Sequence, residues 1–138
     1  MIGIVLVSHG LLAQEFAAAL EHVVGKQEHL ATVSLLSQDD IETKREEILK
    51  AVHDVETGNG VVILTDMFGG TPSNLAHSLL DTPGVEIVAG MNLPLLVKLA
   101  SVRKTKSLRE AVLLAQEAGR KYIHVASHIL SEPHVQNN

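Results

Sequence analysis

Short runs of aliphatic residues alternate along the chain with longer stretches in which apolar residues recur every three or four positions. The short runs are rich in isoleucine, valine and leucine and are bounded by glycine, asparagine, aspartate or serine, which predicts β-strands. They cover residues 2–8, 30–36, 60–66, 85–90 and 122–127. The first and third are almost continuously apolar, which indicates central strands covered on both faces, and the last is more polar, as at an edge.

The intervening stretches predict helices. In the first, Leu12, Phe16, Leu20 and Val23 fall on one helical stripe. Residues 37–40 offer capping side chains at the start of the second. The predicted helices cover residues 11–24, 40–56, 72–80, 95–100 and 107–118. Strands that alternate with helices predict an α/β fold with a doubly wound parallel sheet.

Composition narrows the function classes. The 138 residues are 46% hydrophobic and 20% charged, enough for one domain, which we place at residues 1–127, followed by a polar tail at 128–138. A net charge of −5 and only three aromatic residues argue against nucleic-acid binding. Without cysteine there is no disulfide or thiolate chemistry. The apolar start lacks a basic segment before it and no run reaches the ~20 residues of a membrane span, so we expect a cytoplasmic protein.

Chemically active residues gather where predicted strands end. His9 follows the first strand and Asp66 ends the third. If the strand order is 2-1-3-4, these strands are neighbours about 4.8 Å apart, and ligands bind at this switch point of such sheets. A carboxylate that binds one imidazole nitrogen leaves the other free to act as base, nucleophile or metal ligand. A histidine that only satisfies backbone groups is the other interpretation.

The segment Gly69-Gly70-Thr71-Pro72 follows Asp66. Two glycines, a hydroxyl suited to the N-cap and a proline suited to the first helical position predict a helix start with free amides, which is a site for an anion. A well-capped helix without a ligand explains the same residues. The convergence of His9, Asp66 and this helix start favours the functional interpretation.

Several familiar sites are not supported. The sequence has no phosphate-binding loop, dinucleotide-binding glycine motif or nucleophile elbow. A receiver domain would need an acidic pair after the first strand, where Ser8 and His9 stand. His9 and Asp66 are only two metal ligands, so we predict no metal and no cofactor. We expect His124, His128 and His134 to be surface or edge residues.

The chain resembles the IIA component of the mannose family of the bacterial phosphoenolpyruvate-dependent sugar phosphotransferase system over about residues 1–127. The segment 64–74 (LTDMFGGTPSN) is the most specific part of the resemblance. The other matching segments are 7–10 (VSHG), 89–96 (AGMNLPLL) and 117–120 (EAGR).

This resemblance implies that His9 accepts a phosphoryl group from phospho-HPr and passes it to a IIB domain. Asp66 would orient the imidazole, while Gly70 and Thr71 would hold the phosphoryl oxygens. It also implies an antiparallel edge strand at 122–127, which homodimers of the family exchange. Contact with a membrane would be indirect, through a permease. The phosphoryl transfer would serve either sugar uptake or a regulatory phosphorelay.

Two alternatives remain open. One is the phosphotransfer subunit of dihydroxyacetone kinase, which has a similar histidine; the other is a non-catalytic module that binds a small anion at Gly70 and Thr71.

Docking of a protein partner would use an apolar rim for which Leu11, Leu12, Met67, Phe68 and Met91 are candidates. Of these candidates, we expect Phe68 to lie in the hydrophobic core and not on the docking surface, because lone aromatic side chains are usually buried.

Overall fold

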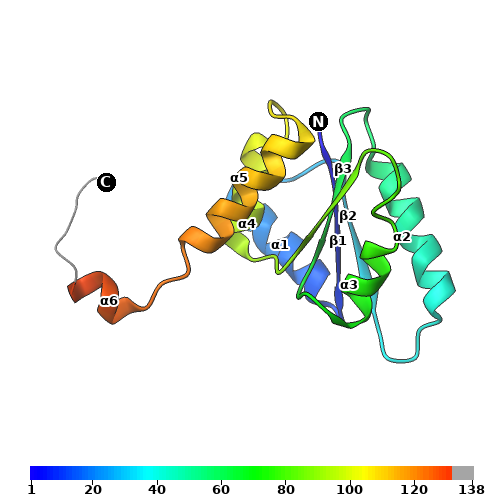
Figure 1. Cartoon of the computed structure of the whole chain (residues 1–138), viewed down its shortest axis with the longest axis horizontal. Helices are drawn as coiled ribbons and strands as arrows, with labels where there is room; N and C mark the ends of the chain where they lie inside the picture. The colour runs from blue at the N-terminus through cyan, green and yellow to red at the C-terminus, as the bar shows by residue number, and fades with distance from the viewer. Residues whose placement is uncertain (132–138) are drawn as a thin grey trace.

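The structure is a computed structural model that describes residues 1–131. Its centre is a parallel sheet with the strand order β2-β1-β3-β4, as the sequence predicts. Strand β1 runs between β2 and β3, and both of its faces are covered (Figure 1). The strands are β1 (Gly3–His9), β2 (Leu30–Leu35), β3 (Val61–Thr65) and β4 (Val85–Ala89).

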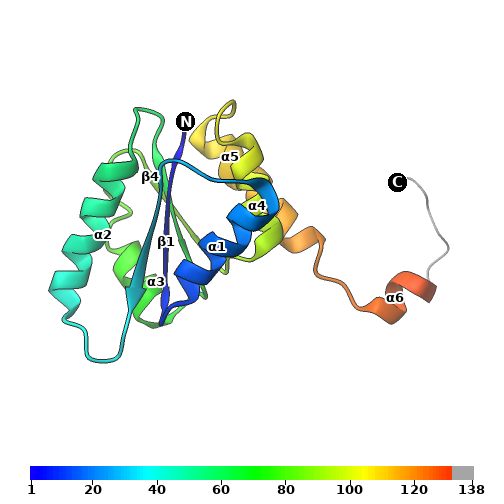
Figure 2. The same cartoon turned by 180° about the vertical axis from the view of Figure 1, so that it is seen from behind.

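Helices cover the two faces of the sheet. One face carries α1, α4 and α5, and the other carries α2 and α3, an arrangement that Figures 1 and 2 show from opposite sides. The helices are α1 (Leu12–Val24), α2 (Ile41–Val55), α3 (Gly70–His77), α4 (Leu93–Val102), α5 (Leu108–Lys121) and α6 (Ala126–Ser131). Among the described residues, none of these helices has the length and apolar character needed to span a membrane.

The alternation of side chains along β1 divides the core into two halves. Ile4 and Leu6 pack with α1, α4 and α5, whereas Val5 and Val7 pack with α2 and α3, and all four are fully buried. Gly3 permits the close approach of α2, because a Cβ there would lie 2.5 Å from the carbonyl oxygen of Val55. A strand buried on both faces has a fixed register, so its last residue is placed reproducibly.

The helix starts differ in how well the sequence predicts them. Asp40 caps α2 as expected, since its Oδ2 accepts a hydrogen bond from the Thr43 amide at 3.1 Å. The prediction that Thr71 caps α3 is wrong, because the N-cap is Gly69 and Pro72 is already the third residue of the helix. Gly69 and Gly70 have φ of 88° and 83°, which lets the chain turn into the helix earlier without a side-chain cap.

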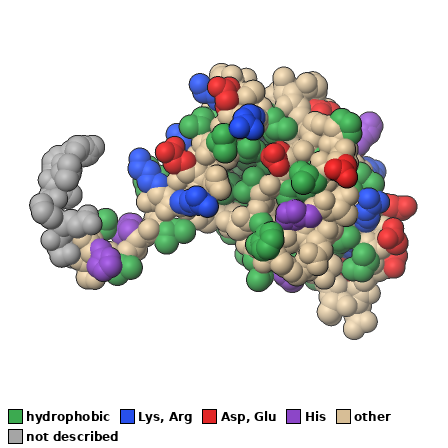
Figure 3. All heavy atoms as spheres, in the orientation of Figure 1, with side chains coloured by type: hydrophobic (Ala, Val, Ile, Leu, Met, Phe, Trp, Pro, Cys, Tyr) green, Lys and Arg blue, Asp and Glu red, His purple; other side chains and the backbone are tan. Residues whose placement is uncertain are grey.

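The predicted last strand does not form within the described residues of the single chain. Residues 122–125 are irregular and lead into α6, so the described chain contains no antiparallel edge strand. A strand needs a partner, and the segment leaves α5 away from the sheet, with hydrophobic side chains on its surface (Figures 1 and 3). The expected domain boundary at 127/128 falls inside α6 and stays a prediction. His134 lies outside the described residues.

A buried arginine ties the opposite end of the sheet together. Arg103, which follows α4 and is 1% exposed, donates from Nε and Nη2 to the Ile2 carbonyl oxygen at 3.0 and 2.8 Å. The same guanidinium donates to the His29 carbonyl oxygen at 2.8 Å and to Oε1 of Gln27 at 3.1 Å. These bonds join the start of β1, the start of β2 and the end of α4, because one planar group spans all three.

Replacing this arginine should therefore cost stability. We expect Arg103→Met to lower the free energy of unfolding by about 3 kcal/mol, because the buried carbonyl oxygen of Ile2 loses both of its hydrogen bonds from the guanidinium and the His29 carbonyl oxygen loses one. Urea denaturation followed by circular dichroism measures the loss. Arg109→Met is the matched control, since it removes the same charge from an exposed position on α5. Equal stability of the two variants would contradict the anchoring role of Arg103.

Candidate functional site

The carboxyl ends of β1 and β3 bring together the two side chains that the sequence predicts as a pair. His9 is the last residue of β1, and Asp66 directly follows β3. Nδ1 of the His9 ring lies 2.8 Å from Oδ2 of Asp66, and the His9 backbone amide donates to the same oxygen at 3.0 Å. The pair exists because the parallel register matches Val7 with Thr65, the residues just before these loops.

The two partners differ in exposure. The His9 side chain is 52% exposed, whereas that of Asp66 is only 9% exposed. A carboxylate accepts hydrogen bonds, so Nδ1 of His9 donates and Nε2 carries the free lone pair when the ring is neutral. The arrangement therefore presents one nucleophilic nitrogen at the surface.

The charge of Asp66 is supported by its neighbours. Burial by itself raises the pKa of the Asp66 carboxyl, but the hydrogen bonds from the ring and the backbone amide of His9 outweigh burial. The amide of Met67 donates to the other carboxylate oxygen, Oδ1, at 3.0 Å. The pKa of Asp66 is therefore below its ordinary value, and the group is an anion at neutral pH.

Gly70 forms the floor beside the imidazole. A Cβ at this position would lie 3.3 Å from both Cε1 and Nε2 of His9, and the positive φ of Gly70 also disfavours a side chain. Gly70 is the first residue of α3, and the first amides of a helix have no partner within the helix. Of the two residues predicted to hold a phosphoryl group, Gly70 therefore lies directly beside the His9 ring.

Thr71 stands at the rim of a hollow next to His9. The hollow has a volume of about 380 Å³, and Thr71 and Pro72 form one wall while the loop after β2 forms the other. The hydroxyl of Thr71 is exposed and makes no hydrogen bond within the described residues, so it is available to a ligand. The lining residues are His9, Gly10, Leu35, Leu36, Ser37, Asp39, Ile41, Thr71 and Pro72.

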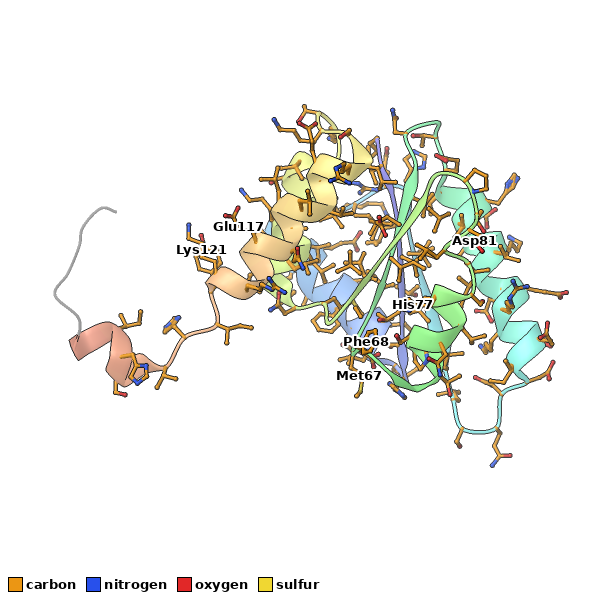
Figure 4. The ribbon with its side chains drawn as sticks, viewed as in Figure 1. Met67, Phe68, His77, Asp81, Glu117 and Lys121 are labelled. Atoms are coloured by element: carbon orange, nitrogen blue, oxygen red, sulfur yellow. The ribbon has the colours of Figure 1, made fainter. Side chains whose placement is uncertain are left out.

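Four of the five rim candidates are exposed. Phe68 is 77% exposed, which makes its assignment to the core wrong, and Met91 is buried at 5%, which removes it from the rim. The Phe68 ring meets the His77 ring edge to face, with centroids 5.8 Å apart, and Figure 4 shows Met67 and Phe68 at the carboxyl-end edge of the sheet. The other exposed candidates are Leu11 at 55%, Leu12 at 44% and Met67 at 54%.

Sequence reasoning missed two apolar residues of this surface. Leu36 and Ile41 are 54% and 47% exposed, and both line the hollow beside His9. Leu36 ends the predicted strand at 30–36, and Ile41 falls within the predicted helix at 40–56. Their position next to the loop at 37–40, at the same sheet edge as His9, is the signal that could have found them. Residues 1–131 contain no group of three or more potential metal ligands.

Comparison with known proteins identifies the family. Residues 3–116 match the family model EIIA-man, described as PTS system fructose IIA component, and the chain belongs to this family of the phosphotransferase system. It is 33% identical over 122 residues to the PTS system mannose-specific EIIAB component of Escherichia coli (strain K12). The match covers 87% of this chain but only 38% of that relative, so the chain spans well under half of the relative's length.

Other relatives match over nearly their whole length. The PTS system fructose-specific EIIA component of Bacillus subtilis (strain 168) is 28% identical, with 99% of this chain and 94% of that protein covered. Among solved structures, the mannose/sorbose-specific IIA subunit from Enterococcus faecalis has a TM-score of 0.80 at 26% identity and covers 98% of both chains. The EIIA component from Streptococcus agalactiae, with a TM-score of 0.84 at 23% identity over 93% of this chain and 99% of that one, supports the same fold.

The lowered pKa of Asp66 gives a pH-dependent prediction. A carboxyl whose pKa is lower when folded stabilises the protein above its unfolded pKa, near 3.8, and that contribution is lost as the pH falls through the folded pKa. We expect the stability lost in Asp66→Asn to be largest above pH 3.8 and to shrink below it. Thermal unfolding between pH 2 and pH 7 would measure this.

The control for this measurement is Asp81→Asn, which changes an exposed carboxylate away from Met67 and Phe68 (Figure 4). We expect this variant to follow the wild type across the pH range. If the stability difference between Asp66→Asn and wild type is constant with pH, the interaction between His9 and the Asp66 carboxylate is not what stabilises the site.

Proposed function

We propose that the protein is a phosphoryl carrier that accepts the group on Nε2 of His9 from phospho-HPr and passes it to a IIB domain. The observation that carries this proposal is the 2.8 Å contact between Nδ1 of His9 and the Asp66 carboxylate. It supports a ring with one fixed proton and one free, exposed lone pair. Membership in the EIIA-man family supports the same role.

The transfer moves the phosphoryl group from the imidazole of the donor to the imidazole of His9, so one phosphorus–nitrogen bond breaks as another forms. The Nε2 lone pair of His9 attacks the phosphorus as the bond between phosphorus and the donor's histidine nitrogen breaks, and that nitrogen keeps the electron pair. The proton on Nδ1 stays between His9 and Asp66, where the carboxylate stabilises the positive charge that develops on the ring. Transfer to the acceptor is the same step in reverse with a different partner. The chemistry is mainly positioning, and nothing in it calls for a nucleotide, metal or other cofactor.

Gly70 and Thr71 are the proposed contacts of the phosphoryl oxygens. Gly70 lies against the Nε2 edge of the ring, and the amides at the start of α3 are not used by preceding turns of the helix. The free hydroxyl of Thr71 adds a further donor on the wall of the same hollow. This combination supports binding of an anion without a positively charged side chain.

The protein partners would dock on the exposed apolar rim around His9. Leu11 and Leu12 follow the end of β1, Met67 and Phe68 follow the end of β3, and all four are exposed, whereas large apolar side chains in that number are unusual on a surface that contacts only water. The sugar permease would be reached only through the IIB acceptor. The same chemistry serves sugar uptake or a regulatory relay.

Phosphorylation tests the proposal directly. Incubation with phosphoenolpyruvate, enzyme I and HPr should add one acid-labile phosphoryl group to the wild type and none to His9→Ala, because only Nε2 of His9 is suitably placed. Mass spectrometry and ³¹P NMR measure the product. His53→Ala, which removes an exposed histidine from α2, is the control and should be phosphorylated normally.

The alternatives predict other outcomes in the same experiment. A module that only binds an anion would bind phosphate stoichiometrically without covalent modification. A phosphotransfer subunit of dihydroxyacetone kinase would be phosphorylated but would pass the group to the kinase and not to a IIB domain. Phosphorylation that persists in His9→Ala would overturn the assignment of His9.

We further propose that two copies exchange their C-terminal segments. The outer edge of β4 has no strand partner among the described residues, and a hollow of about 400 Å³ lies between β4 and α5. Ile123 and Val125 are 74% and 58% exposed in the segment that leaves α5. An antiparallel strand formed by residues 122–127 of a second copy would cover both the edge and these side chains.

A charge in this segment should therefore prevent association. We expect Val125→Asp to shift the protein from dimer to monomer, because a carboxylate would be buried against the partner's sheet. Analytical ultracentrifugation measures the change. Val23→Asp, at a 60% exposed position on α1, is the control and should remain dimeric. A monomeric wild type, or a dimeric Val125→Asp, would contradict strand exchange.

A further inference from the structure

The residue before His9 is a buried serine whose hydroxyl the proposed transfer step does not use. Ser8 lies in β1 with no exposed surface. Its neighbours on the same side of the strand, Ile4 and Leu6, belong to the apolar core. A hydroxyl at the end of such a row is costly to bury unless it forms hydrogen bonds, so its partners indicate what it does.

Both hydrogen-bonding capacities of the Ser8 hydroxyl are used in the turn that follows. Oγ accepts a hydrogen bond from the backbone amide of Ala13 at 2.6 Å and donates to the carbonyl oxygen of His9 at 3.1 Å. The first contact satisfies an amide in the first turn of α1, whose N-cap residue, Leu11, provides no side-chain cap. One hydroxyl thus joins the start of α1 to the backbone of His9.

With this contact, the backbone of His9 is held on both sides. Its amide donates to Asp66 at 3.0 Å, and its carbonyl oxygen accepts from Ser8. The next amide, that of Gly10, donates to the Leu35 carbonyl oxygen at 2.8 Å. The imidazole itself is half exposed, with Asp66 at Nδ1 and Gly70 beside Nε2, so its direction depends on the backbone to which it is attached.

We propose that Ser8 is a positioning residue for phosphoryl transfer, which holds the peptide after His9 so that Nδ1 stays on Asp66 and Nε2 stays over Gly70. This inference rests on the proposed function of His9. Ser8 touches neither the phosphoryl group nor the reacting nitrogen. It acts through the backbone, because its hydroxyl ties the His9 carbonyl oxygen to the start of α1 and so fixes the position of the residue that carries the imidazole.

The chain contains a matched control for this hydroxyl. Ser34 of β2 pairs in register with Ser8, so both side chains emerge on the same face of the sheet. Oγ of Ser34 is buried but forms no hydrogen bond within the described residues. Removing it deletes the same atom from the neighbouring strand without breaking a bond to the site.

The first measurement is the tautomer of His9 in the free protein, read from the ¹⁵N chemical shifts of its ring nitrogens. We expect wild type and Ser34→Ala to hold the proton on Nδ1. In Ser8→Ala the two tautomers should mix as the contact with Asp66 loosens, and Ser8→Thr, which keeps the hydroxyl, should restore the wild-type spectrum. This measurement needs no partner protein, so it tests Ser8 even if His9 proves not to be phosphorylated.

The second measurement is the rate of phosphoryl transfer from phospho-HPr. We expect Ser8→Ala to lower kcat by roughly tenfold to a hundredfold with little change in KM, because orientation is lost but the docking surface is intact. Ser34→Ala should match wild type, and Ser8→Thr should recover. If Ser8→Ala does not fold, Ser8→Cys, which is similar in volume but a weaker hydrogen-bonding group, replaces it.

Three results would overturn the inference. Wild-type tautomer and wild-type kcat in Ser8→Ala would show that the hydroxyl has no influence on His9. A lower kcat with an unchanged ¹⁵N spectrum would place its effect outside the imidazole. Equal losses in Ser8→Ala and Ser34→Ala would show a general core defect. A wild type that is never phosphorylated refutes the function of His9 instead, and leaves the tautomer result to decide on Ser8.

Discussion

The parallel pairing of β1 with β3 is the constraint on which the site depends. Both strands are buried and carry side chains that pack into two separate halves of the core, so a shift by one residue would turn apolar groups out of each half. This register fixes the ends of the strands side by side. The 2.8 Å contact between His9 and Asp66 follows from it and needs no special loop conformation. Arg103 holds the opposite end of β1, so the strand is fixed at both of its ends.

In the proposed phosphoryl site beside this pair, backbone groups and small residues take the place of the positively charged side chains of many anion sites. No lysine or arginine lines the hollow beside His9. The ring has the Asp66 carboxylate at Nδ1 and Gly70, the first residue of α3, beside Nε2. Backbone amides are weaker partners of a phosphoryl group than a bidentate arginine. For a carrier, which must give the group up as readily as it accepts it, moderate binding of this kind is an advantage.

The sequence predicts the strands from their periodicity, and it predicts the His9–Asp66 pair once the strand order 2-1-3-4 is assumed, because both residues stand at the ends of strands that this order makes neighbours. It failed where a choice depends on packing at the surface. Phe68 is aromatic, and nothing local distinguishes a buried ring from one that lies on His77. The cap of α3 was misplaced because glycine conformations, not the Thr71 hydroxyl, decide where that helix begins. The segment 122–127 is predicted as a strand from its composition, but a strand requires an edge to pair with, and in this structure the segment leaves α5 without pairing with the outer edge of β4.

The apolar residues that are unexpectedly exposed bear on the function. Apolar residues at the starts of α1 and α2 follow the helical stripe that predicts a core, yet Leu12 and Ile41 lie outside it, 44% and 47% exposed. Both stand at the helix ends nearest the end of the sheet where His9 is located, and Ile41 lines the hollow with Leu36, whereas the middles of the same helices are buried at Leu20 and Ile48. A periodic pattern predicts which side chains form an apolar face, but it does not show whether that face is buried by the same chain or by a partner protein. Near His9 the fold leaves several apolar side chains exposed. A second protein that docks at this end of the sheet would bury them.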